Sequence, residues 1–142
     1  MSEIQDRISE KIKDISKCTE ELYEYIPGSY EEYYKNPLKK LACERLYEKI
    51  IEATISIALF ILRYKEWETP RDEGGAFQVL ADKGVISEIL ATRLRDAKGM
   101  RNFIIHQYGE IDDLKVYTAI TEELAEDINK FIEAIENFLS TK

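Results

Sequence analysis

The stretch "LKKLACERLYEKIIEATISIALFI", residues 38–61, decides the fold of this chain. Apolar residues return along it every three or four positions, which is the spacing of one face of an α-helix. Pro37 stands directly before the stretch and is suited to the first turn of a helix, where its missing N–H is not needed. We therefore predict one long helix whose apolar stripe enters the core: Leu38, Leu41, Leu46, Ile50, Ala53, Ile57 and Ile61.

The chain before this stretch reads as two further helices. Helical spacing from Ile4 to Leu22 predicts a first amphipathic helix, and Pro27-Gly28 ends it. Ser29 with Glu32 has the spacing of a capping box and predicts the start of a second, short segment.

The chain after the stretch is also helical. The polar residues 68–75 predict a loop, and a short helix around Phe77 and Leu80 should end near Gly84. Another helix should begin near Ser87, and a single last helix should follow residues 112–113 and carry an apolar face as far as Leu139. No alternation typical of strands appears. The expected fold is all-α: one domain over residues 1–142, an antiparallel bundle of four to five helices.

Composition restricts the class of protein. With 142 residues, 44% of them hydrophobic and 34% charged, the chain is large enough for one core and has the balance of a soluble globular domain. It shows neither the plan of a signal peptide nor an apolar run long enough to cross a bilayer, so a cytoplasmic protein without membrane contact is expected. Cys18, Cys43 and one histidine are too few and too distant for a structural metal site, and we interpret both cysteines as packing thiols.

The charge distribution isolates one basic segment. The whole chain carries a net charge of −8, which argues against binding nucleic acid without regard to sequence. Residues 93–109 nevertheless have a net charge of +3, because four basic residues face only Asp96: Arg93, Arg95, Lys98 and Arg101. Such a segment can concentrate an anionic ligand. The alternative is that these cations pair with acidic residues elsewhere in the fold.

The basic segment overlaps the stretch "MRNFIIHQYGEID", residues 100–112, which contains the only histidine of the chain, His106. On a helix Asn102 and His106 share a face, and so do Arg101 and Tyr108. Arg101 and His106 lie about 140° apart around the axis. They can converge only if the arginine reaches round, the helix bends, or a second copy of the chain contributes. Three apolar residues between them, at positions 103–105, are expected to anchor the turn in apolar surroundings.

Arginine, asparagine and histidine together suit cleavage of RNA. A histidine can take the proton of a ribose 2′-hydroxyl, and an arginine can hold the phosphate and its developing charge. The leaving 5′-oxygen also needs a proton donor, which a second histidine would supply in a two-fold dimer. The alternative is an ordinary core or surface histidine, since an Arg-x4-His spacing alone is weak evidence.

The sequence resembles the HepT-like family of HEPN-domain proteins, the toxin half of a two-gene module with a minimal nucleotidyltransferase. Three stretches carry the resemblance: "SYEEYYKNPLKKLACERLYEKIIEA", "GAFQVLADKGVIS" and "GMRNFIIHQYGEIDDLKVYTAI". The resemblance implies a metal-independent endoribonuclease that works as a homodimer with the motif at the subunit interface. Arg101, Asn102 and His106 match the catalytic motif, and Tyr108 matches the tyrosine that the cognate nucleotidyltransferase modifies with AMP.

The chain departs from the family pattern in its long helix. Family members often carry an acidic residue one turn after a glutamate there, whereas Glu52 is followed by Ser56. For Glu44 and Arg45 we expect an ion pair, within the helix or between subunits, rather than a role in catalysis.

The leading hypothesis is a ribonuclease toxin that needs no cofactor. Its expected partners are RNA, a cognate nucleotidyltransferase antitoxin and a second copy of the chain, with no DNA expected. Arg93, Arg95 and Lys98 are the candidates for RNA binding. The second hypothesis is a non-catalytic module in which the same residues hold a nucleotide or dock the nucleotidyltransferase. An inert structural bundle, the third, would explain the core but not the clustered polar residues.

Overall fold

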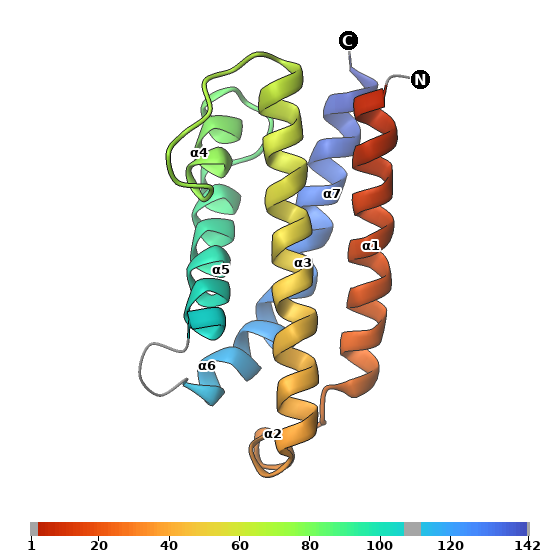
Figure 1. The fold of residues 1–142 in the computed structure, drawn as a ribbon, viewed down its shortest axis with the longest axis vertical. Helices are drawn as coiled ribbons and strands as arrows, with labels where there is room; N and C mark the ends of the chain where they lie inside the picture. Colours follow the sequence, from red (N-terminus) through yellow and green to blue (C-terminus); the bar gives the residue numbers. More distant parts are fainter. Residues whose placement is uncertain (1–2, 107–111, 142) are drawn as a thin grey trace.

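The protein is seen here in a computed structural model that describes residues 3–106 and 112–141. The long helices run antiparallel, and the start of α1 lies at the same end of the bundle as the end of α7 (Figure 1). This confirms the predicted all-α bundle. None of the described helices is long and apolar enough to cross a membrane. In chain order the segments are α1 (Glu3–Tyr25), α2 (Tyr30–Lys35), α3 (Pro37–Tyr64), α4 (Gly75–Asp82), α5 (Glu88–His106), α6 (Asp113–Thr118), η1 (Ala119–Leu124) and α7 (Ala125–Ser140).

Side-chain caps start both the short segment α2 and α3, and the cap at Ser29 was predicted from the sequence. The Ser29 hydroxyl accepts a hydrogen bond from the Glu32 N–H at 3.2 Å, which satisfies a donor at the start of α2. Asn36 accepts one from the Lys39 N–H at 3.1 Å, and Pro37 is the first residue of α3. The predicted interruption between the two helices is therefore confirmed.

The apolar stripe of α3 forms the centre of the bundle from Leu46 onward. Its later members are 7% exposed or less: Leu46, Ile50, Ala53, Ile57 and Ile61. The prediction was wrong for the first two, because Leu38 is 79% exposed and Leu41 is 59% exposed. These residues belong to the first turns of α3, at the end of the bundle where the short α2 lies (Figure 1).

The last helix is not one regular α-helix as predicted. A π-helical turn, η1, lies between α6 and α7 and places one residue more in each turn than an α-helix does. The Tyr23 hydroxyl on α1 donates a hydrogen bond of 2.6 Å to the Ile120 carbonyl in this turn. Apolar spacing could not reveal η1, because the buried positions Ile120, Leu124 and Ile128 still recur every four residues.

Both cysteines are buried and free, which confirms their interpretation as packing thiols. Burial raises the pKa of the Cys43 thiol to about 11 and also raises the pKa of Cys18. Neither thiol is therefore activated as a nucleophile at neutral pH.

Candidate functional site

The candidate site lies on α5, which is anchored in the core by one face. The Leu90 N–H donates to the Ser87 hydroxyl at 3.1 Å, and this cap starts the helix where the sequence predicted it. Of the three apolar residues of the motif, only Ile104 is buried; Phe103 and Ile105 are each 41% exposed. The expectation that all three anchor the turn was wrong, because one helix cannot bury three successive side chains against a core on one side.

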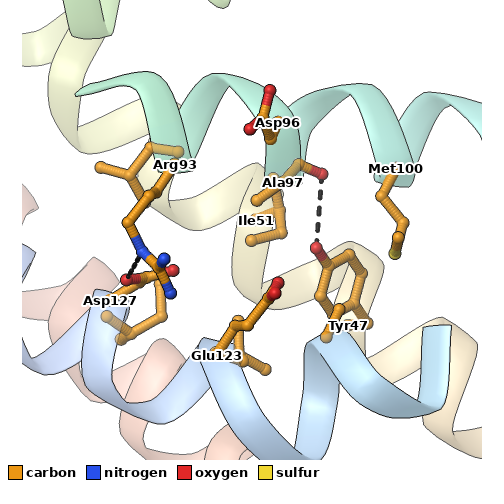
Figure 2. Close-up of a pocket in the computed structure, with 12 residues that line it drawn as sticks. Tyr47, Ile51, Arg93, Asp96, Ala97, Met100, Glu123 and Asp127 are labelled. Carbon is orange, nitrogen blue, oxygen red and sulfur yellow. Dashed lines mark hydrogen bonds and ion pairs between the residues drawn. The ribbon is translucent and has the colours of Figure 1, made fainter. Parts of the chain in front are cut away.

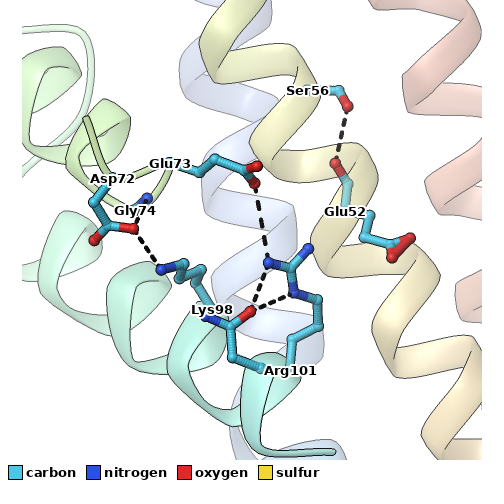
Figure 3. A network of polar contacts seen from close by, with 8 residues as sticks. Glu52, Ser56, Asp72, Glu73, Gly74, Lys98 and Arg101 are labelled. Atoms are coloured by element: carbon cyan, nitrogen blue, oxygen red, sulfur yellow. Dashed lines mark hydrogen bonds and ion pairs between the residues drawn. The ribbon is translucent and has the colours of Figure 1, made fainter. Parts of the chain in front are cut away.

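Arg101 and Asn102 form the centre of the polar network on α5. The Nε and Nη2 atoms of Arg101 both donate to the Asn102 side-chain oxygen, at 3.1 and 2.7 Å. Nη2 also lies 3.9 Å from a carboxylate oxygen of Glu73, in the loop between α3 and α4 (Figure 3). The Arg101 side chain is only 12% exposed, and the two hydrogen bonds to Asn102 fix the orientation of its guanidinium.

His106 is the last residue of α5 and is exposed. The helix is α-helical from Glu88 to His106, so no change of helix type brings His106 round toward Arg101. Tyr108, the predicted modification site, lies outside the described residues, as does Gly109.

Two of the three candidate RNA-binding cations already have acidic partners. Arg93 Nε lies 2.6 Å from a carboxylate oxygen of Asp127 on α7, and this hydrogen bond raises the pKa of Arg93 (Figure 2). Lys98 Nζ lies 2.5 Å from Asp72, whose pKa it lowers through the hydrogen bond. The alternative interpretation, pairing within the fold, therefore applies to Arg93 and Lys98. Arg95 is exposed.

A small pocket of about 120 Å³ lies on another side of α5, between α3, η1 and α7 (Figure 2). Its polar lining includes Asp96, Glu123 and the paired Arg93 and Asp127. The Tyr47 hydroxyl donates to the Ala97 carbonyl at 3.5 Å within it. With three carboxylates against one guanidinium, this pocket does not suit an anionic ligand.

The residues of α3 that depart from the family pattern have local roles. Arg45 pairs with Glu48 at 3.3 Å within the helix, as expected. The Ser56 hydroxyl donates to the Glu52 carbonyl at 3.0 Å, and both residues line a groove between α1 and α3. In the described part of the chain, no group of three or more His, Cys, Asp or Glu residues could hold a metal ion.

Glu44 differs from these neighbours because it is 7% exposed. Burial, and next the charge of Asp113, raise the pKa of its carboxyl group. Asp113 itself is paired with Lys40 at 2.6 Å, a contact that ties α3 to the start of α6. No pattern in the sequence indicated this contact, since its partners are 73 residues apart.

Glu44→Gln should therefore stabilise the protein at neutral pH. Because the folded state raises the pKa of Glu44, the contribution of this residue to stability is most favourable below its unfolded pKa and is lost as pH rises through its folded pKa. Glutamine does not ionise and removes this loss of stability. The variant should therefore be more stable than wild type at pH 7 and equally stable near pH 4. Urea unfolding at both pH values measures the difference. Glu24→Gln, an exposed control on α1, should show no such pH-dependent gain; an equal gain in both variants would contradict the prediction.

Comparison with known families identifies the family of the chain. The family model described as "Ribonuclease HepT-like" matches residues 15–135, which include the whole of α5. The chain belongs to the ribonuclease HepT-like family.

Two curated relatives of this HepT-like chain are nucleases. The mRNA nuclease HepT of Shewanella oneidensis is 25% identical over 94% of this chain and 98% of its own length. The tRNA nuclease HepT of Aphanizomenon flos-aquae is 26% identical over 94% of this chain and 90% of its own. The predicted class, a ribonuclease, is confirmed.

Solved structures agree with this HepT-like assignment. A tri-AMPylated HEPN toxin of Shewanella oneidensis, in complex with the MNT antitoxin, superimposes with a TM-score of 0.87 at 26% identity and covers 96% of this chain and 99% of its own. A toxin–antitoxin crystal structure with AMP-PNP also gives 0.87, at 25% identity, covering 93% and 98%. The cytosolic protein YutE of Bacillus subtilis, at 17% identity and a TM-score of 0.76, shares the fold; its alignment covers 94% of this chain and 90% of YutE.

Proposed function

We propose that this HepT-like chain is the endoribonuclease toxin of a toxin–antitoxin module, that it cleaves RNA without a metal ion, and that it acts in the cytoplasm. The observation that supports this most is the Arg101–Asn102–His106 motif on one packed helix of a ribonuclease family fold. The Arg101 guanidinium is held by Asn102 in a fixed orientation before any ligand arrives. A preorganised cation of this kind stabilises charge that develops on a phosphate.

In the proposed reaction His106 takes the proton of a ribose 2′-hydroxyl. The resulting oxygen attacks the adjacent phosphorus, and the bond to the 5′-oxygen of the next nucleotide breaks. The products are a cyclic phosphate and a 5′-hydroxyl, whose proton comes from a general acid. Arg101 faces the phosphate oxygens, which gain negative charge during the attack.

The general acid is proposed to be His106 of a second copy of the chain. Arg101 and His106 are about 140° apart on a regular helix, which favours a site shared between two motif helices. Phe103 and Ile105 are half-exposed on the same segment and provide apolar surface for such a contact. The homodimer therefore belongs to the proposed mechanism.

RNA would reach this site along the basic face of α5, where Arg95 is exposed. Arg95 is the leading candidate, because Arg93 and Lys98 are engaged by Asp127 and Asp72. Those two residues remain candidates only if RNA displaces their carboxylate partners. The alternative function is a non-catalytic module in which the same residues hold a nucleotide or dock the nucleotidyltransferase. Metal-independent cleavage of RNA by the purified chain distinguishes the two.

The partner is proposed to be a minimal nucleotidyltransferase that transfers AMP to Tyr108, since a similar HEPN toxin is AMPylated in complex with its MNT antitoxin. The phenol oxygen attacks the α-phosphorus of ATP, pyrophosphate leaves, and the phenol proton goes to solvent. The added phosphate would compete for Arg101 and the adenosine would block RNA entry.

Tyr108→Phe should remove this modification without removing nuclease activity, because only the phenol oxygen is lost. Wild type incubated with the cognate nucleotidyltransferase and ATP should gain the mass of AMP and lose RNA cleavage; the variant should gain none at this position and stay active. Tyr64→Phe, an exposed tyrosine at the end of α3, is the control and should behave as wild type. AMP on other residues of the wild type with none on Tyr108 would exclude Tyr108 as the site.

A further inference from the structure

Two acidic residues at the end of the loop between α3 and α4 face two cations of the motif helix. Asp72 contacts Lys98, and Glu73 approaches Arg101, one turn further along α5 (Figure 3). Sequence reasoning identified these residues only as part of a loop. The cations and the acids come from separate elements, and only the fold brings them together.

The two contacts differ in strength. The Asp72–Lys98 pair is hydrogen-bonded at 2.5 Å, and Asp72 also accepts a bond from the Gly74 N–H at 3.4 Å. The Glu73–Arg101 pair is 3.9 Å long, beyond hydrogen-bond distance, and the Glu73 side chain is 57% exposed. The first contact holds the loop on the helix, whereas the second is a weak and screened attraction.

The backbone of Glu73 is fixed independently of its side chain. Its carbonyl accepts a hydrogen bond from the Ala76 N–H at 3.1 Å at the start of α4. The neighbouring Gly74 packs so closely on α5 that an added Cβ would lie 3.3 Å from the Lys98 side chain. The Glu73 carboxylate can therefore turn away from Arg101 by rotation about its own side-chain bonds, with no movement of the loop.

The guanidinium of Arg101 can exchange the Glu73 carboxylate for a phosphate, because it has five N–H donors and the two hydrogen bonds to Asn102 do not use all of them. Nε and Nη2 are directed to the neutral oxygen of Asn102, which orients the guanidinium but does not neutralise its charge. The carboxylate of Glu73 supplies the negative charge. A phosphate is also an anion with oxygen acceptors and can form the hydrogen bonds that Glu73, at 3.9 Å, does not.

We propose that the Glu73 carboxylate stands in for an RNA phosphate at Arg101 and is displaced when the RNA backbone binds. This inference rests on the proposed function and identifies Glu73 as a group of the chain itself that competes with RNA for Arg101. Glu73 thus reduces the affinity of the empty site for RNA, and Asp72 with Lys98 keeps this competitor in place. Lys98 on this view anchors the loop and does not contact RNA.

The test measures binding of a 2′-O-methylated oligoribonucleotide, which keeps the phosphates but has no attacking hydroxyl. Glu73→Gln should tighten binding about two- to fivefold, the range expected on removing an exposed charge contact. Glu68→Gln removes the same charge from an exposed position of the same loop and should have a clearly smaller effect. In an Arg101→Ala background, Glu73→Gln should add nothing. In cleavage assays of RNA, Glu73→Gln should lower KM by the same factor.

Equal effects of Glu73→Gln and Glu68→Gln would overturn the proposal, because net charge alone would then explain both. A gain that persists without Arg101, or a rise in KM, would overturn it as well. These outcomes leave the proposed nuclease function intact as long as the wild type cleaves RNA. A wild-type chain that neither cleaves RNA nor binds the oligonucleotide would overturn both proposals together.

Discussion

Replacing His106 with alanine should lower the rate of metal-independent RNA cleavage by roughly 10²- to 10⁴-fold, the usual contribution of a general acid or base. His106 is exposed at the end of α5, so its loss should leave the core unchanged. Cleavage of a labelled RNA in the presence of a chelator measures the effect, and circular dichroism checks the fold. Growth inhibition on expression of the protein should disappear with the same substitution.

Arg101→Ala should cost nearly as much, about 10²- to 10³-fold, because it removes the charge that meets the phosphate. Lysine should not restore activity, since it cannot make the paired Nε and Nη2 contacts to Asn102. Cleavage that persists in both the His106 and the Arg101 variants, or that stops when a chelator is added to wild type, would rule out the mechanism.

The shared site gives the His106 prediction a second test. If two copies of His106 serve one reaction, wild type mixed and refolded with excess His106→Ala should lose more activity than dilution explains. A loss in strict proportion to the wild-type fraction, or a strictly monomeric protein in light scattering at micromolar concentration, would contradict the composite site.

Leu62→Ala should lower the free energy of unfolding by about 2–5 kcal/mol, the usual cost of such a truncation in a packed core. Leu62 is fully buried near the end of α3, where the bundle surrounds the helix. The substitution removes apolar contacts and leaves a cavity that rigid neighbouring helices cannot close. Urea denaturation followed by circular dichroism measures the change.

Leu38→Ala is the matched control, the same substitution at the other end of the same helix. Leu38 is 79% exposed, so its truncation should change stability by no more than about 0.5 kcal/mol. A cost of several kcal/mol at Leu38 would show that another surface, such as a second copy, covers the start of α3. A small cost at Leu62 would contradict the core described here.

Local signals predicted most of the fold. The cap at Ser29, the proline at the start of α3 and the loop before α4 act through contacts within a few residues, so the sequence displays them directly. The exposure of Leu38 and Leu41 and the π-helical turn η1 were missed. The exposure of the two leucines depends on which helices are present at that end of the bundle, which periodicity does not record. The buried positions around η1 keep the four-residue spacing of an α-helix, so periodicity does not reveal the turn.

The sequence by itself determined the helical class, the family resemblance, and the residues of the motif: Arg101, Asn102, His106 and Tyr108. It did so because these residues lie close together in the chain, where spacing and residue type are visible. Only the tertiary structure decided the partners of the basic segment. Asp127 for Arg93, Asp72 for Lys98 and Glu73 for Arg101 come from distant elements. An ion pair forms where folding places two charges within a few ångströms, and separation along the chain does not record that distance.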